Sequence, residues 1–188
     1  MKRRDLLFVL LSAGAARAAE SAARKKLSSI EDDLAPPGWL SFTAKEVNVL
    51  AVEELASEAL QGVSQPLVVL GANRATASAR IDFARVRESA TGETPGALSR
   101  LLLGGDKDVS VEATFRTGEG QCEIDVTRVI ISGLEIKGRL LDWLTENYLL
   151  PLYPTAKVGR PFEMGHRIDR MEMTPARVRF LIVAGALA

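Results

Sequence analysis

The sequence offers few side chains that could support catalysis or hold a metal ion. His166 is the only histidine and Cys122 the only cysteine among 188 residues. A Ser-His-Asp triad would have to use His166, and no Gly-x-Ser-x-Gly turn accompanies it. One histidine and one cysteine far apart in the sequence do not make a zinc site. We therefore assign no catalytic residue, no metal ligand and no cofactor, and a hydrolase centred on His166 is the least favoured alternative.

Carboxylates are numerous but scattered along the chain. An acid–base pair of the glycosidase type needs two carboxylates that meet in a cleft, which sequence spacing alone does not show. The glycine-containing stretches Gly104–Asp108 and Gly118–Gly120 lack the Lys-Ser/Thr of a phosphate-binding loop. We interpret both stretches as turns.

Residues 1–18 have the three parts of a secretory signal peptide. A basic start at Met1–Asp5 precedes the apolar run Leu6–Leu11, and Ala16–Ala18 provides a small-x-small exit. The apolar run is shorter than the roughly 20 residues that span a bilayer. We expect cleavage after Ala18, export to the periplasm or the extracellular space, and no transmembrane span in the mature chain. An uncleaved amphipathic anchor and a buried N-terminal helix are the alternatives.

The charge balance argues against a nucleic-acid partner. Cleavage after Ala18 would remove four basic residues and one acidic residue, so the formal charge would change from 0 to −3. No basic stripe remains in the sequence, so the sequence gives no support for a nucleic-acid partner or for polybasic adhesion to a membrane. Arg3 and Arg4 are also a feature of twin-arginine signals, but the rest of that motif is imperfect and adjacent arginines are common in ordinary signals, and the export route stays open. Cys122 has no partner for a disulfide, so packing alone must hold the fold.

Two helices and a spacer are predicted around a single domain over residues 39–188. Residues 19–38 read as a spacer or a short helix. A capping box at Thr43 and Glu46 begins a long helix that extends to about Gln61. A short apolar helix is expected over residues 95–103, and a second full helix near residues 137–149.

Alternation of apolar and polar residues predicts strands between these helices. It runs over residues 75–83, 109–116 and 122–136, and a closing hairpin covers 171–182. Apolar residues at every second position, with one face of the strand exposed to solvent, are typical of antiparallel sheet. In the third run, Arg128 and Ser132 interrupt the apolar series that includes Ile130 and Leu134, which indicates a β-bulge.

The order of these elements resembles a known family. The capping-box helix, the alternating hairpins, the helix before Pro151 and the closing Met171–Met173 and Arg177–Phe180 strands resemble the tubular lipid-binding (TULIP) family of bacterial exported domains. The resemblance covers about residues 40–183 and rests on no signature residue. It implies a long helix in a highly curved sheet and an apolar groove for acyl chains. We accordingly predict an α+β fold in which a curved antiparallel sheet wraps a long N-terminal helix.

The amount of apolar surface suggests a ligand. Strand positions predicted to face the core are often small, at Ala75, Ala77, Ala79 and Ala113. Small residues at these positions either let a helix pack closely or leave room for a ligand. The first hypothesis is a cell-envelope carrier of a lipid or hydrophobic small molecule. The alternative is a structural or protein-interaction module with a filled core and an envelope protein as partner. The candidate lining residues are Val47, Leu50, Leu55, Ile81, Phe83, Leu102, Phe115, Ile124 and Val126.

Overall fold

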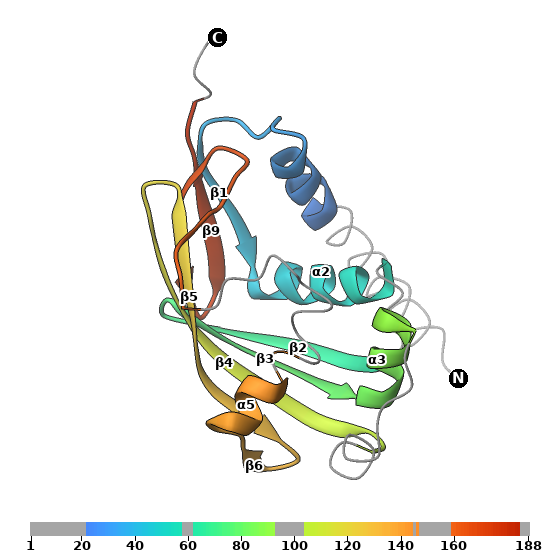
Figure 1. Cartoon of the computed structure of the whole chain (residues 1–188). Helices are drawn as coiled ribbons and strands as arrows, with labels where there is room; N and C mark the ends of the chain where they lie inside the picture. The colour runs from blue at the N-terminus through green and yellow to red at the C-terminus, as the bar shows by residue number, and fades with distance from the viewer. Residues whose placement is uncertain (1–21, 58–61, 93–103, 145, 147–158, 185–188) are drawn as a thin grey trace, which may run out of the picture.

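A computed structural model shows two antiparallel sheets joined at a corner, with short helices beside them (Figure 1). The proposed signal segment, the predicted helix over residues 95–103 and the candidate Leu102 lie outside the described residues, as does the side chain of Leu55. The described residues are 22–57, 62–92, 104–144, 146 and 159–184.

The smaller sheet has three strands in the order β1-β9-β8. Its strands are β1 (Gly38–Thr43), β9 (Arg177–Ile182) and β8 (Ile168–Thr174). A helix over residues 22–31 covers the inner face of this sheet. The sequence predicted either a spacer or a short helix over residues 19–38, and the structure forms a helix within this segment. With Leu70 of the larger sheet, these elements enclose the first hydrophobic core, whose members are Ile30, Ala35, Phe42, Leu70, Met173, Val178 and Ile182.

The capping box predicted from the sequence is confirmed. Helix α2 (Ala44–Ser57) begins directly after Thr43. The Thr43 hydroxyl accepts a hydrogen bond from the Glu46 amide at 3.2 Å, and the Glu46 carboxylate accepts one from the Thr43 amide at 2.8 Å. Lys26 on the preceding helix donates to the same carboxylate at 2.7 Å. Glu46 thus links two helices at the end of β1.

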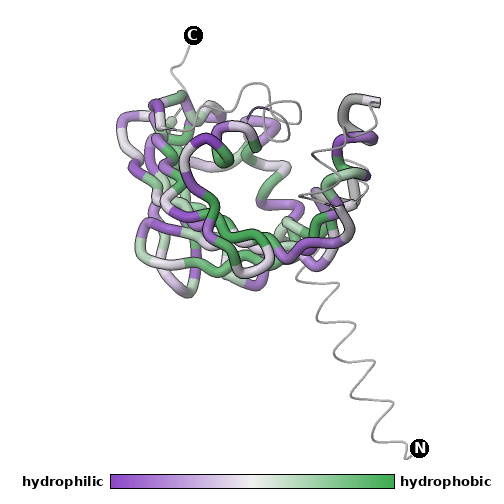
Figure 2. Tube along the Cα trace, turned by 60° about the horizontal axis from the view of Figure 1, so that its bottom comes forward, coloured by the Kyte–Doolittle hydropathy of each residue, from purple (hydrophilic) through white to green (hydrophobic). Residues whose placement is uncertain are grey.

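The larger sheet follows the order β2-β3-β4-β5-β6, and β7 also pairs with β5. The short helix α3 (Phe83–Thr91) follows β3, and α5 (Arg139–Leu144) follows β6. Figure 2 shows that hydrophobic and hydrophilic segments are interspersed along the backbone of the described chain. The strands are β2 (Val63–Gly71), β3 (Arg74–Ile81), β4 (Lys107–Gly118), β5 (Gln121–Ile131), β6 (Leu134–Glu135) and β7 (Phe162–Glu163).

Side-chain and backbone hydrogen bonds join the two sheets where β4 meets β8. The Thr117 hydroxyl donates to the Met171 carbonyl at 2.6 Å and accepts from the Met171 amide at 3.1 Å. The Asn73 amide, in the turn between β2 and β3, donates to the Met173 carbonyl at 3.2 Å. The edge of β8 is therefore held against the end of the larger sheet.

The predicted architecture, a curved sheet wrapped on a long N-terminal helix, is wrong. The structure is mostly antiparallel sheet with short helices, and the strands divide into two sheets. Helix α2 lies at the edge strand β2 and is not enclosed, since Val52 on it remains 53% exposed. Of the predicted helix near residues 137–149, the structure describes the six-residue α5 and residue 146. No helix within the described residues is long and apolar enough to cross a membrane.

Candidate functional site

The register of the larger sheet defines one apolar face across four strands. Ala77 on β3 pairs with Val68 on β2 and with Val111 on β4, and Val111 pairs in turn with Val129 on β5. Residues directly opposite each other share a face of the sheet. The apolar residues that the sequence pattern grouped on β3 and β4 therefore form one continuous surface with those of β2 and β5.

Two hydrophobic cores occupy opposite ends of this face. Val68, Leu70, Ala75 and Phe115 belong to the first core, beneath the smaller sheet and α2. At the other end lies a second core with α3 and α5, formed by Phe83, Val129, Ile131, Ile136 and Leu144, with Ile81, Val109, Val111 and Val126 packed against it.

A strip of mostly small residues separates the two cores. Ala77, Ala79, Ala113 and Ile124 belong to neither core as the described residues form them, and we call these four residues the alanine strip. Ala77 is exposed, although its neighbour Val68 lies in the first core and its neighbour Val111 in the second. The other three residues are half-buried. Within the described residues, the middle of this apolar sheet face is therefore less completely covered than its two ends.

The structure divides the predicted lining residues between these regions. Val47, Leu50 and Phe115 pack against the first core, and Ile81, Phe83 and Val126 belong to the second. Phe83 is buried at 7% exposure at the start of α3, so its predicted place on the alternating strand is wrong. Asp82 ends β3 there, because its carboxylate accepts from the Ala84 and Arg85 amides and caps the helix. Ile124 alone among the described candidates lies in the alanine strip.

A bulge in β5 reverses the predicted facing of the residues after it. Glu112 pairs with Arg128 and Ala113 pairs with Val126, so Thr127 is the extra residue. Beyond the bulge, Val129 and Ile131 are buried, whereas Leu134 is 70% exposed. The bulge predicted in this run is confirmed, next to Arg128 and not at Ser132, but the assignment of Ile130 and Leu134 to the apolar face is wrong.

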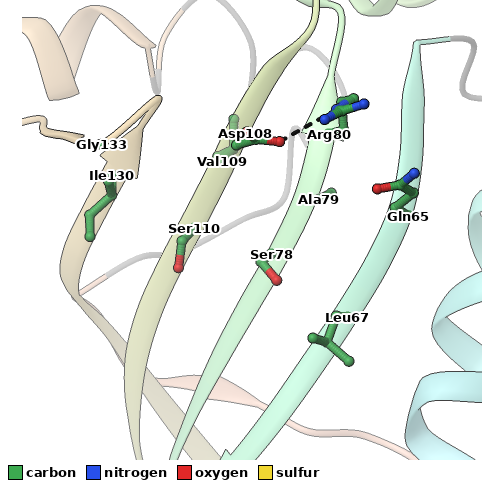
Figure 3. Close-up of a pocket in the computed structure, with 10 residues that line it drawn as sticks. All are labelled: Gln65, Leu67, Ser78, Ala79, Arg80, Asp108, Val109, Ser110, Ile130 and Gly133. Carbon is green, nitrogen blue, oxygen red and sulfur yellow. Dashed lines mark hydrogen bonds and ion pairs between the residues drawn. The ribbon is translucent and has the colours of Figure 1, made fainter.

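The opposite face of the larger sheet carries a shallow groove (Figure 3). Leu67, Ser78, Ser110 and Ile130 lie in one row across the four strands and line this groove, which has a volume of about 340 Å³. The Arg80 guanidinium lies 3.4 Å from the Asp108 carboxylate at one side. Sequence alternation predicted the two serines on a polar face, but Ile130 reaches this groove only because of the bulge.

Among the residues that the structure describes, the side chains considered for chemistry do not assemble into a reactive group. The His166 ring is half-exposed and lies 3.7 Å from the Asp33 carboxylate, which is itself 58% exposed. Burial raises the pKa of the Cys122 thiol, which lies on β5 as a small buried apolar side chain. Among the described residues, no cluster of three His, Cys, Asp or Glu could hold a metal ion.

Burial acts to raise the pKa of the Glu46 carboxyl, but hydrogen bonds from Lys26 and Thr43 outweigh it and hold that pKa below its ordinary value. These same hydrogen bonds hold the helix 22–31, the end of β1 and α2 together. Glu46 therefore has a structural role at this junction.

Comparisons of the chain with protein-family models, with curated proteins and with solved structures each found no match.

Proposed function

We propose that this chain is an exported cell-envelope protein that binds a lipid or another hydrophobic ligand without catalysis. The observation that carries the proposal is the alanine strip, an incompletely covered band between two cores on one apolar face. The proposal does not depend on the tubular architecture that the sequence led us to expect.

The alanine strip has residue types that suit the binding of a hydrocarbon ligand. The side chains of Ala77, Ala79 and Ala113 are methyl groups, so they provide an apolar surface and themselves fill little of the space above it. Val68 and Val111 flank Ala77 as branched apolar walls. Each Å² of apolar surface removed from water contributes roughly 25 cal/mol, so an acyl chain laid on such a band would be stabilised along its length. No polar group is required for this mode of binding.

Export is supported by the sequence of residues 1–18, with its basic start, apolar run and small-x-small exit. A periplasmic or extracellular carrier would meet lipids at a membrane surface. A hydrophobic ligand in an aqueous compartment needs such a carrier, because its free concentration in water is low.

An interaction module is the second candidate function, and the groove on the opposite face favours it. Leu67 is 51% exposed and Val69 is 56% exposed on the edge strand β2, beside the serines of the groove. Exposed apolar residues beside a groove are a common feature of protein-binding surfaces. An envelope protein would be the partner in this case.

Native mass spectrometry of the gently purified protein tests the main proposal. We expect a population heavier than the chain by the mass of a lipid, and the same lipid in an organic extract of the sample. A bare mass would contradict the proposal if the protein also failed to take up phospholipid during incubation with vesicles. Recovery of a bound protein with no lipid would favour the interaction module.

A further inference from the structure

The outer face of the smaller sheet gathers arginines around an exposed tryptophan. Trp39 pairs with Leu181, and the Arg179 guanidinium stacks over the Trp39 ring at 4.3 Å. Strand alternation and register place Arg170 and Arg177 on the same face. We call this surface the Trp39 face, defined by Trp39, Arg170, Glu172, Arg177, Arg179 and Leu181.

The face is open to solvent, whereas its reverse side is core. Trp39 is 41% exposed, and Arg170 and Arg177 are both exposed. On the reverse side, Phe42 and Ile182 are 2% and 1% exposed. The sheet is therefore amphipathic in an unusual sense, because its outer side combines a large aromatic ring with cations.

The charge of the Trp39 face differs from that of the chain as a whole. Among the six residues that define the face, three are arginines and one, Glu172, is a carboxylate, whereas the whole chain has a formal charge of 0. Glu172 pairs with Arg179 at 2.6 Å. Within the described part of the chain, no ion pair involves Arg170 or Arg177, so two guanidinium groups are available to an anion.

We propose that the Trp39 face docks on an anionic phospholipid bilayer. Tryptophan is enriched at the membrane–water interface, where its ring meets the acyl boundary and its N–H remains hydrated. Arginine pairs bidentately with phosphate oxygens, and each basic residue near an anionic surface adds to binding. Val183, which directly follows β9 and is 43% exposed, adds apolar surface beside Leu181. This surface is not evident from the sequence, because its arginines come from two strands and form no basic run.

The proposal is independent of whether the alanine strip holds a ligand. Its test uses vesicles of phosphatidylcholine alone and vesicles with equimolar phosphatidylglycerol. The protein carries two tryptophans, and a Trp143→Phe variant makes Trp39 the sole fluorescent reporter. We expect the Trp39 emission to shift to the blue, and the protein to co-sediment, with the phosphatidylglycerol vesicles only. Raising the salt concentration should weaken this binding because the attraction is between exposed charges.

Two matched double variants locate the binding. Arg170→Gln/Arg177→Gln should weaken vesicle binding by about 25-fold, at about fivefold for each arginine. Arg74→Gln/Arg128→Gln changes the net charge equally on the larger sheet, where both arginines are more than half exposed, and should leave binding nearly unchanged. Circular dichroism confirms that each variant is folded.

Several results would overturn the docking proposal. They are an absence of binding to either vesicle, equal binding to both, or equal losses in the two double variants. A dimer that dissociates in Trp39→Ala would assign the face to a second copy of the chain and would also contradict it. Co-purified lipid in a protein that ignores vesicles would refute the docking surface and leave the carrier proposal standing.

Discussion

Asn48 holds the edge strand of the larger sheet by pairing with both backbone groups of Val68. Its side-chain amide donates to the Val68 carbonyl at 2.8 Å and accepts from the Val68 amide at 2.7 Å. The side chain thereby takes the place of a neighbouring strand and covers a part of β2 that could pair with another chain. Val68 lies opposite Ala77 on the neighbouring strand, so this contact also positions a residue at the border of the alanine strip.

Replacing Asn48 by alanine should leave two backbone groups without partners. We expect Asn48→Ala to lower the free energy of unfolding by about 2 kcal/mol, the usual cost of unsatisfied polar groups. Urea denaturation measures this loss. Lys45→Ala changes an exposed residue on the same helix and should have little effect. Equal losses in the two variants would show that the contact with Val68 contributes nothing specific.

The joint between the two sheets gives a second prediction. Thr117→Val preserves the shape of the side chain but removes the hydroxyl that bonds both backbone groups of Met171. We expect a loss of about 1–3 kcal/mol in the free energy of unfolding, since both Met171 groups lose their partner. Thr114→Val, on the same strand, is the control. If Thr117→Val were as stable as the wild type, the sheets would be held together by apolar packing alone.

Glu46 predicts a pH dependence of stability. Its pKa in the folded chain lies below the ordinary 4.5, so the ionised carboxylate stabilises the fold above that pH. This contribution is lost as the pH falls from 4.5 through the lower folded pKa. Glu46→Gln should therefore be less stable than the wild type at neutral pH, and the difference should shrink in acid. Urea titrations of both proteins over this range measure it, and a difference that stays constant with pH would contradict the assignment.

Local signals in the sequence predicted the elements well where a short stretch of chain decides the structure. The capping box needs only Thr43 and Glu46, and the β4–β5 hairpin needs only the turn that includes Glu119 and Gly120, where both residues have positive φ. Alternation likewise located the strands, because side chains point to opposite faces in turn.

The sequence-based predictions are wrong where a single residue, or a contact with a distant part of the chain, changes the local structure. Asp82 caps a helix where alternation continued the strand to Phe83. Thr127, as the extra residue of a bulge, moves Ile130 to the other face. The position of α2 depends on a hydrogen bond between Asn48 and a strand 20 residues away, which helical periodicity does not contain. The alanine strip was anticipated by residue type, but its place between two cores follows from the pairing of β2, β3 and β4.

A binding titration with a fluorescent acyl-chain probe tests the alanine strip most directly. Ala77→Leu/Ala79→Leu adds bulk on the strip, and Thr76→Leu/Ser78→Leu adds leucines to the same strand on its other face. The account predicts at least about tenfold weaker binding for the first variant, equivalent to about 1.4 kcal/mol, and near wild-type binding for the second. Equal affinity in all three proteins, or a loss confined to Thr76→Leu/Ser78→Leu, would contradict it.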